Sequence, residues 1–299
     1  MDVSLEVFVT VVEKGNFTRA AEELRMTQPA VSQYIQALER TVGAKLLERT
    51  NKYVRLNQAG EIVFHHAKDI LGMYTRMQTL VDDLLHRASG DLSISASYTF
   101  GEYVLPHLLA YMHEVYPLIR PRINIGNTTE VAEAILNHQA DIGIVEGEYY
   151  HENLHIEAFA EDEMFVIVPN EERYAGRGEI SLSELGKETW IVRESGSGTR
   201  RAAEHMFTSR HFQPDNKMEF GSTQLIKESV EAGLGVTLLS HWAVRKEISL
   251  GTLIMLKPDG EPVRRHFSLI TQATPYHTKA AEIFLDLLRM NKAFPVSYV

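Results

Sequence analysis

The sequence of 299 residues predicts an α/β protein made of a winged helix-turn-helix, a long linker helix and two α/β lobes. Three observations predict this fold class. Two short helical patterns, separated by a helix-capping signal, are followed by a short two-stranded pattern. A helical pattern without proline then spans residues 58–88, and strands alternate with helices from residue 89 onward. We therefore expect domains at residues 1–58, 59–88 and 89–299.

The first two helical patterns predict a pair of short packed helices. Over residues 18–25, apolar side chains recur at helical spacing, and small alanines let a second helix approach closely. These side chains are Phe17, Ala20, Ala21 and Leu24. Thr27 is a good N-cap for the second helix, and Pro29 lies in its first turn, where a missing N–H costs no hydrogen bond. The buried stripe of the second helix is Val31, Ile35 and Leu38.

The opposite face of the second helix is polar and uncharged. Amide and hydroxyl groups on such a face can donate to and accept from base edges in a DNA major groove. We expect Gln28 and Gln33 to contact bases, and Ser32 to contact a phosphate, because its short side chain reaches the backbone more easily. The predicted DNA-contacting residues of this helix are Thr27, Gln28, Pro29, Ser32, Gln33 and Gln36.

A small two-stranded wing is expected after Gly43, from the pair of leucines at 46–47 and the run at 53–56. It carries Arg49, Lys52 and Arg55, which are candidates for contacts with DNA phosphates. Each could instead be a solvated surface charge, and for Lys52 alone the two interpretations have similar weight. Together with the helix pair, contact with DNA is the better interpretation.

Charge is unevenly distributed along the chain, whose net charge is -10. Residues 1–66 hold eight basic and eight acidic side chains, whereas residues 67–299 hold 22 and 32. Within residues 19–55 the balance is seven against four, so positive charge is concentrated on the helix pair and the wing. A local positive field favours phosphate contact even in an acidic protein. We expect DNA to be bound by this end only.

One long helix is expected over residues 58–88, with Asn57 as its cap. Its apolar residues recur at spacings of three, four and seven: Ile62, Val63, Ile70, Leu71, Met77, Leu80, Val81, Leu84 and Leu85. A small winged domain cannot bury so long a stripe, so we expect a second copy of the same helix as its partner. The alternative is that the stripe packs onto its own C-terminal region.

From residue 89 onward, alternating strands and helices predict two α/β halves with a mainly parallel sheet. The expected strands are 92–96, 123–126, 141–145, 164–168, 190–192, 217–220, 235–239 and 267–270. The expected helices are 104–115, 129–137, 182–185, 199–207, 223–232 and 277–290.

Four strand-to-helix junctions are rich in small polar residues, and helix N-termini at the carboxyl ends of strands favour anions. The most informative junction is residues 195–200, where two glycines permit close approach, Thr199 can cap the following helix, and Arg200 and Arg201 add positive charge. Alone, this segment could equally be a flexible turn with an N-cap. The predicted ligand-binding residues are Ser97, Tyr98, Thr99, Asn127, Thr128, Thr129, Ser195, Gly196, Ser197, Gly198, Thr199 and Thr223.

Other functions have weak support. There are no cysteines, no apolar run long enough to cross a membrane, and no secretory signal, so we expect a cytoplasmic protein. Nucleophile-elbow, phosphate-loop and dinucleotide-binding motifs are missing, and the histidines at 65–66 and 151 lack metal-ligand spacing. Glu146 and Glu148 could form a carboxylate pair, but acidic residues in a loop are usually solvated, and we interpret both in this way. We expect no enzymatic activity, metal or cofactor.

Residues 1 to about 66 resemble the DNA-binding domain of LysR-type transcriptional regulators. The matching segments are 8–12, 17–24, 27–35 and 46–49. Two positions depart from the family pattern, Leu47 in place of phenylalanine and Asn57 in place of threonine, and both are conservative. The resemblance is long and specific at this end and weaker beyond it, where it depends on the order of elements and on Gly-Leu-Gly-Val at 233–236.

The resemblance implies a periplasmic-binding-protein-like effector domain whose chain crosses twice between its lobes, near residues 157–162 and 262–266. Lobe I would then hold about residues 89–161 and 266–299, and lobe II about residues 162–265. Family members with an Arg-Glu-x-Gly-Ser-Gly-Thr-Arg segment, here residues 193–200, include regulators of sulfur and carbon assimilation, which favours a small metabolic anion as effector.

The sequence therefore predicts a sequence-specific transcriptional regulator controlled by a small anionic effector or carboxylate. Its expected partners are double-stranded promoter DNA, a second or further copies in a homodimer or homotetramer, and RNA polymerase. A nucleoid-type architectural protein would need distributed basic charge, and a free solute-binding protein would not carry a DNA-binding domain.

Overall fold

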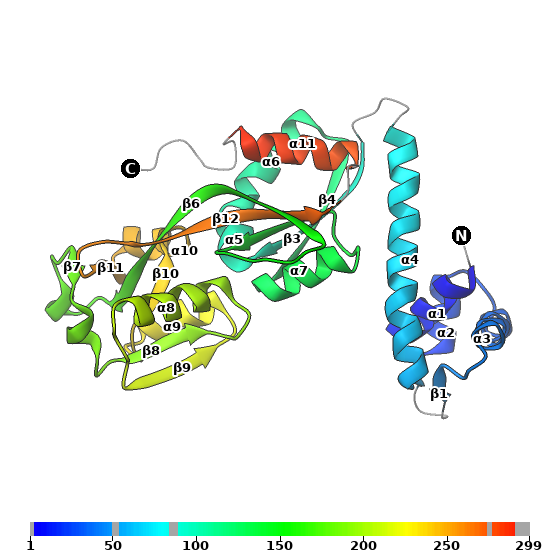
Figure 1. The fold of residues 1–299 in the computed structure, drawn as a ribbon, viewed down its shortest axis with the longest axis horizontal. Helices are drawn as coiled ribbons and strands as arrows, with labels where there is room; N and C mark the ends of the chain where they lie inside the picture. Colours follow the sequence, from blue (N-terminus) through cyan, green and yellow to red (C-terminus); the bar gives the residue numbers. More distant parts are fainter. Residues whose placement is uncertain (1–2, 50–53, 84–88, 274–276, 291–299) are drawn as a thin grey trace. The chain divides into compact units, whose positions relative to one another are not determined.

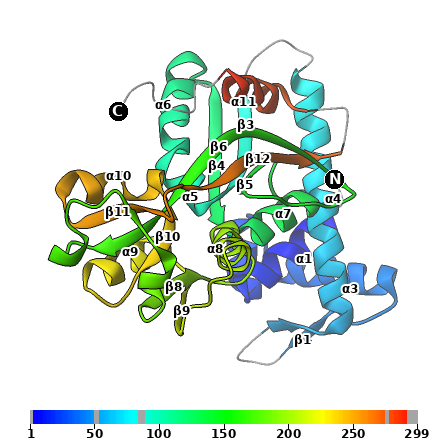
Figure 2. The ribbon, with the colours of Figure 1, turned by 60° about the vertical axis from the view of Figure 1, so that its left-hand side comes forward.

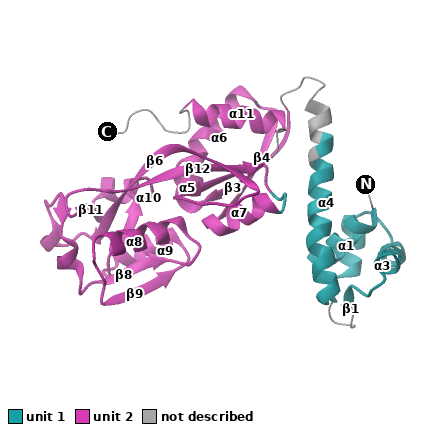
Figure 3. Ribbon diagram, viewed as in Figure 1, with its two compact units in different colours: residues 1–86, 137–139 teal, residues 87–136, 140–299 magenta. Residues whose placement is uncertain are grey.

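The computed structural model describes residues 3–49, 54–83, 89–273 and 277–290. The chain divides into two compact units, residues 1–86 with 137–139 and residues 87–136 with 140–299 (Figure 3).

The first unit contains the predicted helix pair. Its helices are α1 (Val3–Lys14), α2 (Phe17–Glu23) and α3 (Gln28–Val42). Asn16 caps α2, and the Thr27 hydroxyl caps α3 by accepting from the N–H of Ala30 at 3.4 Å. The predicted cap is therefore confirmed. Helix α3 ends at Gly43, whose left-handed φ of 78° is readily adopted by glycine.

The predicted core of the helix pair is also confirmed. Ala20 and Ala21 are 0% and 4% exposed, which lets α1, α2 and α3 pack closely. The stripe of α3 faces the same core, together with Phe8 of α1 and Leu46 before the wing. Burial of this stripe leaves the opposite face of α3 outward.

The wing consists of β1 (Leu47–Arg49) and β2 (Val54–Leu56), which pair antiparallel with Leu47 opposite Leu56. It leads into α4 (Gln58–Asp83). The Asn57 carboxamide accepts from the N–H of Gly60 at 2.8 Å and donates to the carbonyl of Lys45 at 2.8 Å. Asn57 therefore caps α4, as predicted, and also ties it to the start of the wing.

The predicted apolar residues of α4 do not all lie on one surface. The expectation that the whole stripe packs against a second copy of the helix is therefore partly wrong. Val63 and Leu71 pack on the core of the helix pair, whereas Ile62, Ile70 and Met77 are 59%, 49% and 51% exposed. The helix has apolar groups on two faces, and the winged domain covers one of them. The side chains of residues 80 and 81, and residues 84–88, lie outside the described residues.

The second unit contains an eight-stranded sheet in the order β4-β3-β5-β12-β6-β11-β7, with β10 also paired to β6 (Figure 1). Its strands are β3 (Gly90–Ser97), β4 (Ile119–Gly126), β5 (Ile142–Glu146), β6 (Leu154–Pro169), β7 (Glu179–Ile180), β10 (Thr237–Ser240), β11 (Leu253–Pro258) and β12 (Val263–Gln272). Two further strands, β8 (Thr189–Arg193) and β9 (Asn216–Phe220), pair in parallel.

The prediction of a mainly parallel sheet is wrong. Strands β3, β4 and β5 are parallel, but β12 runs antiparallel to β5 and β6, and β10 and β11 run antiparallel to β6. The reason is that the chain leaves one lobe along β6 and returns along β12, so two long strands of opposite direction lie side by side (Figures 1 and 2). Both segments implied as crossovers fall on or next to this strand pair, where Asp162 faces Arg265.

The helices of the second unit are α5 (Tyr98–Tyr103), α6 (Leu105–Val115), α7 (Thr128–Leu136), α8 (Gly198–Ser209), α9 (Thr223–Glu231), α10 (His241–Leu250) and α11 (Lys279–Arg289), with 3-10 turns η1 (Glu172–Tyr174) and η2 (Leu182–Leu185). The helix predicted over residues 104–115 is confirmed as α6, with Pro106 in its first turn, and α5 ends just before it at Tyr103. The elements that were not predicted from the sequence are α1, α5, α10, β7, β11 and the 3-10 turn η1.

Each lobe has a core on both faces of its sheet. In lobe I, α6 and α11 cover one face and α7 covers the other (Figure 1). Phe100, Phe267 and Phe284 occupy the first face, and Ile270 occupies the second. In lobe II, Trp190 packs with the α8 side of the sheet and Ile191 with the α9 side. Strand β12 therefore contributes side chains to the cores on both faces of lobe I.

Candidate functional site

The outward face of α3 is polar and uncharged, as predicted. Thr27, Gln28, Pro29, Gln33 and Gln36 are exposed, and Ser32 is half-buried. The Gln28 amide donates to the Ser32 hydroxyl at 3.2 Å. No acidic side chain stands among these six residues, so the face can approach an anionic duplex without local repulsion.

A buried carboxylate, which was not predicted from the sequence, fixes the end of α3 to the wing. Glu39 is 5% exposed, and its oxygens accept from the N–H of Leu46 at 3.1 Å and from the Lys45 ammonium at 2.8 Å. This contact sets the position of the wing relative to α3.

The structure describes the three predicted wing cations to different extents. The Arg55 side chain on β2 is exposed. Arg49 is the last residue of β1, opposite Val54, but its side chain lies outside the described part, as does all of Lys52. Their role in DNA contact stays a prediction.

In the second unit, Glu146 is the point at which three of the four predicted junctions meet. This last residue of β5 is 2% exposed. Its carboxylate accepts from the N–H of Thr99 at 2.7 Å and from the hydroxyl of Thr199 at 3.2 Å. The Thr128 hydroxyl donates to its carbonyl at 3.5 Å. The interpretation of Glu146 as a solvated loop residue is wrong, because it ends a fully buried strand.

Arg265 of β12 completes a buried group of charges. Its guanidinium lies 2.8 Å from Glu146 and donates to Asp162 of β6 at 2.7 Å. It also donates to the hydroxyls of Thr199 at 3.0 Å and Thr99 at 3.1 Å. We call Thr99, Glu146, Asp162, Thr199 and Arg265 the interlobe cluster, because its members come from both lobes and from both connecting strands.

The pKa values of the two carboxylates bound to Arg265 are shifted in opposite directions. Burial raises the pKa of Glu146, but Arg265 and the hydrogen bonds from Thr99 outweigh it, so this pKa lies below its usual value. Burial raises the pKa of Asp162 more than Arg265 and Ser240 lower it, so this pKa lies above its usual value. Burial lowers the pKa of Arg265, but the two carboxylates outweigh burial and raise it. Arg265 therefore stays charged, and Asp162 is the carboxylate that protonates more readily.

The fourth junction joins the first through another buried guanidinium. Arg193, at the end of β8, is 2% exposed and donates to the Thr223 hydroxyl at 3.0 Å. Its guanidinium lies over the Tyr98 ring at 4.2 Å, and Glu194 accepts two further bonds from it at 2.6 and 2.7 Å. Tyr98 and Thr223 therefore both contact the Arg193 guanidinium.

The glycines of the 195–200 junction permit two close approaches. At Gly196, φ is 87°, and a Cβ would lie 3.0 Å from the Thr129 hydroxyl and 3.3 Å from the Asn127 amide oxygen. At Gly198, a Cβ would lie 2.1 Å from the Glu146 carbonyl oxygen, which no side chain can occupy. The two lobes therefore touch through backbone at this junction.

One detail of this junction differs from the expectation. The cap of α8 is Ser197, whose hydroxyl accepts from the N–H of Arg200 at 3.4 Å, and not Thr199. Thr199 lies one residue inside the helix, and its hydroxyl serves the interlobe cluster instead. Ser97 and Ser197 are buried, whereas Ser195 is exposed. Residues from all four junctions thus converge, and their role in ligand binding stays a prediction.

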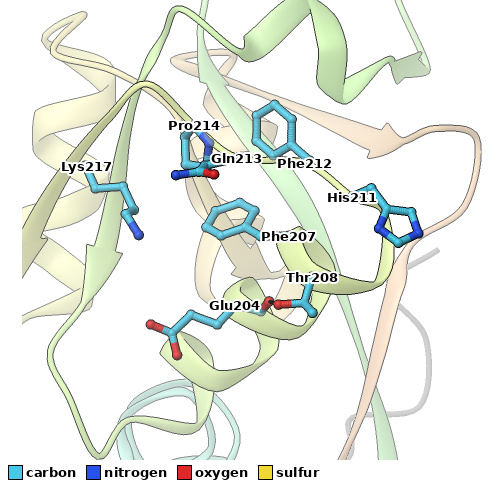
Figure 4. A pocket seen from close by; sticks show the side chains of 8 residues that line it. All are labelled: Glu204, Phe207, Thr208, His211, Phe212, Gln213, Pro214 and Lys217. Carbon is cyan, nitrogen blue, oxygen red and sulfur yellow. Dashed lines mark hydrogen bonds between the residues drawn. The ribbon is translucent and has the colours of Figure 1, made fainter.

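Two cavities adjoin α8. A cavity of about 630 Å³ lies at the C-terminal end of this helix, between Phe207, Phe212 and Lys217 (Figure 4). All of its lining residues belong to lobe II. A second cavity, of about 450 Å³, is bounded by Gly147 after β5, by α8 and by the start of β12, and therefore touches both lobes. Among the described residues, no acidic or histidine cluster could hold a metal ion, and no helix could span a membrane.

Comparison with known proteins agrees with this arrangement. The domain described as "Bacterial regulatory helix-turn-helix protein, lysR family" matches residues 3–61, and "LysR substrate binding domain" matches residues 86–293. HTH-type transcriptional regulator CysL of Bacillus subtilis is 39% identical over 287 residues, 96% of each chain. HTH-type transcriptional activator CmpR of Synechocystis sp. is 34% identical, covering 95% of this chain and 93% of CmpR.

Solved structures share the fold. CbnR complexed with its target DNA has a TM-score of 0.75 at 20% identity, covering 97% of this chain and 99% of CbnR. The regulatory domain of Synechocystis CcmR in complex with 2-PG has a TM-score of 0.63 at 27% identity, covering 68% of this chain and 98% of that domain. The chain therefore belongs to the LysR family of transcriptional regulators, and its function is the regulation of transcription rather than catalysis.

Proposed function

We propose that the protein binds promoter DNA through α3 and the wing, and that a small anion or carboxylate bound between the two lobes controls this binding. One observation carries the proposal: the interlobe cluster draws its hydrogen bonds from both lobes and from both connecting strands. A ligand that enters this cluster must alter contacts that hold the lobes together. Ligand binding and lobe arrangement are then coupled.

On the DNA side, the exposed face of α3 supports groove recognition. Gln28 and Gln33 would contact base edges and Ser32 a phosphate, with Arg49, Lys52 and Arg55 of the wing clamping the backbone. The remaining proposed contacts of α3 are Thr27, Pro29 and Gln36.

The exposed apolar residues of α4 support assembly as a homodimer or homotetramer. Ile62, Ile70, Met73 and Met77 are each about half exposed, a cost in water that a second copy of α4 would remove. A dimer would present two α3 helices to half-sites about 34–36 Å apart, or multiples of that spacing.

We further propose that the domains span residues 1–58, 59–88 and 89–299. We also propose a cytoplasmic location for the protein and RNA polymerase as a further partner.

The donors of the interlobe region support an anionic effector. Thr99, Thr199 and Arg265 direct their donors at Glu146, so an incoming anion would compete with this carboxylate for them. The ligand 2-PG, named with the related CcmR domain, suggests one such anion. We propose the effector contacts at Ser97, Tyr98, Thr99, Asn127, Thr128, Thr129, Ser195, Gly196, Ser197, Gly198, Thr199 and Thr223.

The test is whether an anion stabilises the effector lobes. Binding of a ligand to the folded state raises the free energy of unfolding, by about 2.7 kcal/mol at 100 times the Kd, and therefore raises the unfolding temperature. We expect 2-PG or another small anion in a panel of organic and phosphorylated acids to raise the unfolding temperature of the full-length protein, and Thr199→Ala to reduce that rise. A rise that Thr199→Ala leaves intact would remove this junction from the site.

A further inference from the structure

The cavity of about 450 Å³ beside α8 lies next to the interlobe cluster. Its walls are the turn after β5, with Gly147 and Glu148, the face of α8 that carries Arg201 and His205, and the start of β12 with Arg264 and His266. It shares Gly198 and Arg265 with the region of the interlobe cluster but opens onto different side chains.

Arg201 differs from the arginines around it. Its side chain is half-buried, and its Nη2 atom is shielded from water without a hydrogen-bond partner in the described part of the chain. Arg200, the next residue along, bonds to Glu204 at 2.5 Å, to Glu219 at 3.0 Å and to a backbone carbonyl at 2.9 Å. A buried donor without a partner costs free energy, and the rest of the Arg201 side chain lines the cavity, so this guanidinium can accept an anion as its partner.

The surroundings of Arg201 do not neutralise it. Glu146 attracts it at a distance, but that carboxylate is already bound to Arg265. Burial lowers the pKa of Arg201, and the attraction of Tyr149 and Glu146 does not restore it. A partly desolvated cation without a fixed counterion is a common feature of anion sites.

Two other basic side chains of the cavity, Arg264 and His266, are weakly paired. Arg264 lies 3.6 Å from Glu163, and His266 lies 3.9 Å from Glu161, with side chains that are 43–66% exposed. Glu148 is the acidic residue in the wall, against the guanidiniums of Arg201 and Arg264, because Arg265 is already paired with Glu146 and Asp162. The cavity therefore has an excess of donors and positive charge.

We propose that this cavity is a second anion site, in which Arg201 binds a tetrahedral oxyanion, either free phosphate or sulfate or the phosphoryl group of a small metabolite. Guanidinium groups bind such oxyanions through two parallel hydrogen bonds. The walls come from lobe I, lobe II and β12, so an anion bound here would also affect how the lobes are held. The proposal does not depend on the effector contacts proposed above.

The test is titration calorimetry of the full-length protein with inorganic phosphate, sulfate and glycerol 3-phosphate. We expect binding by the natural protein and a loss of at least about ten-fold in affinity for Arg201→Gln. Arg200→Gln, the same charge change on the neighbouring residue, should bind as the natural protein does. Equal affinity for phosphate and glycerol 3-phosphate would indicate a site that contacts only the phosphoryl group. Tighter binding of phosphate would favour the free anion as the ligand, and tighter binding of glycerol 3-phosphate would favour a phosphorylated metabolite.

A second readout separates a binding role from a structural one. Because Arg201 lacks a partner, Arg201→Gln should raise the unfolding temperature without anion by about 2 °C, while phosphate should raise that of the natural protein only. If Arg201→Gln unfolds more easily, Arg201→Lys keeps the charge and should retain weakened phosphate binding.

Two results would overturn the proposal. One is the failure of the natural protein to bind phosphate or sulfate, and the other is unchanged phosphate affinity in Arg201→Gln. If Thr199→Ala loses phosphate binding and Arg201→Gln keeps it, the anion binds at the interlobe cluster. The second site is then wrong while the proposed function stands.

Discussion

The outward face of α3 and the interlobe cluster are both polar, but they hold their polar groups in opposite ways. On α3, the amides of Gln28, Gln33 and Gln36 are exposed and have few partners within the protein. In the interlobe cluster, the charged groups are buried and bonded to one another. The first surface is ready for an external partner, whereas the second must exchange internal bonds before it can bind one. This difference suggests that DNA contact needs no rearrangement of α3, and that effector binding does rearrange the lobes.

The largest expected effect comes from removing the cation of the cluster. Arg265→Met leaves Glu146 and Asp162 buried without their shared counterion, which should lower the free energy of unfolding by about 3–5 kcal/mol. Urea unfolding of the full-length protein would measure it. Arg264→Met, on the exposed neighbour, should change stability by no more than about 0.5 kcal/mol. Similar losses of stability in both variants would contradict the role of Arg265 as the counterion of two buried carboxylates.

A smaller loss is expected where the lobes touch through backbone. In Gly198→Ala the new methyl group would meet the Glu146 carbonyl, so the junction must move apart at a cost of about 1–3 kcal/mol. Gly221→Ala provides the control, because nothing lies within 4 Å of a Cβ there. Circular dichroism during urea unfolding would compare the two. An unaffected Gly198→Ala protein would argue against tight contact at this junction.

On α3, the comparison predicts an effect on binding without one on folding. Gln33→Ala removes an exposed amide, so stability should hold while discrimination between operator and scrambled duplex falls by about 1–3 kcal/mol. Arg49→Ala should instead weaken binding to both duplexes and reduce the slope of log affinity against log salt by about 1. Salt titrations by fluorescence anisotropy measure both. Equal losses on operator and scrambled duplex for Gln33→Ala would exclude a base contact.

The smallest effect concerns pH. The pKa of Asp162 is raised in the folded protein, so its ionised form costs stability at neutral pH, and that cost disappears as the pH falls through its folded pKa. Asp162→Asn removes this cost, so its stability relative to that of the natural protein should be greater at pH 7 than at pH 4.

The pKa of Glu146 is lowered in the folded protein, so this carboxylate stays ionised at neutral pH. Its stabilising contribution is lost only as the pH falls through its folded pKa. Urea midpoints between pH 4 and pH 7, with Asp286→Asn as an exposed control, would test the prediction. A difference that grows as the pH falls would mean that the direction assigned to Asp162 is wrong.

The two regions also differ in how far the sequence predicts them. The α3 face follows from local patterns, because Thr27, Pro29 and the stripe at 31, 35 and 38 determine both the start of the helix and its orientation. The convergence of the four junctions was predicted from the general rule that ligands bind at the carboxyl ends of strands.

The charged members of the cluster were missed because their partners lie far away in sequence. Arg265 and Asp162 are separated by 103 residues, and only the antiparallel pairing of β6 with β12 brings them together. A signal was nevertheless present. Arg265 alternates with Phe267 and Leu269, which are buried, so strand periodicity places its side chain on the same inward face. A charge at an inward strand position indicates a buried partner.

The most direct measurement is the affinity of the full-length protein for an operator selected from random duplexes, with and without 2-PG or another anion shown to stabilise the protein. The account predicts that the anion changes operator affinity by about 5–150-fold in the natural protein, and that Thr199→Ala brings this ratio close to one. An anion that binds between the lobes yet leaves operator affinity unchanged would contradict the coupling of the two regions.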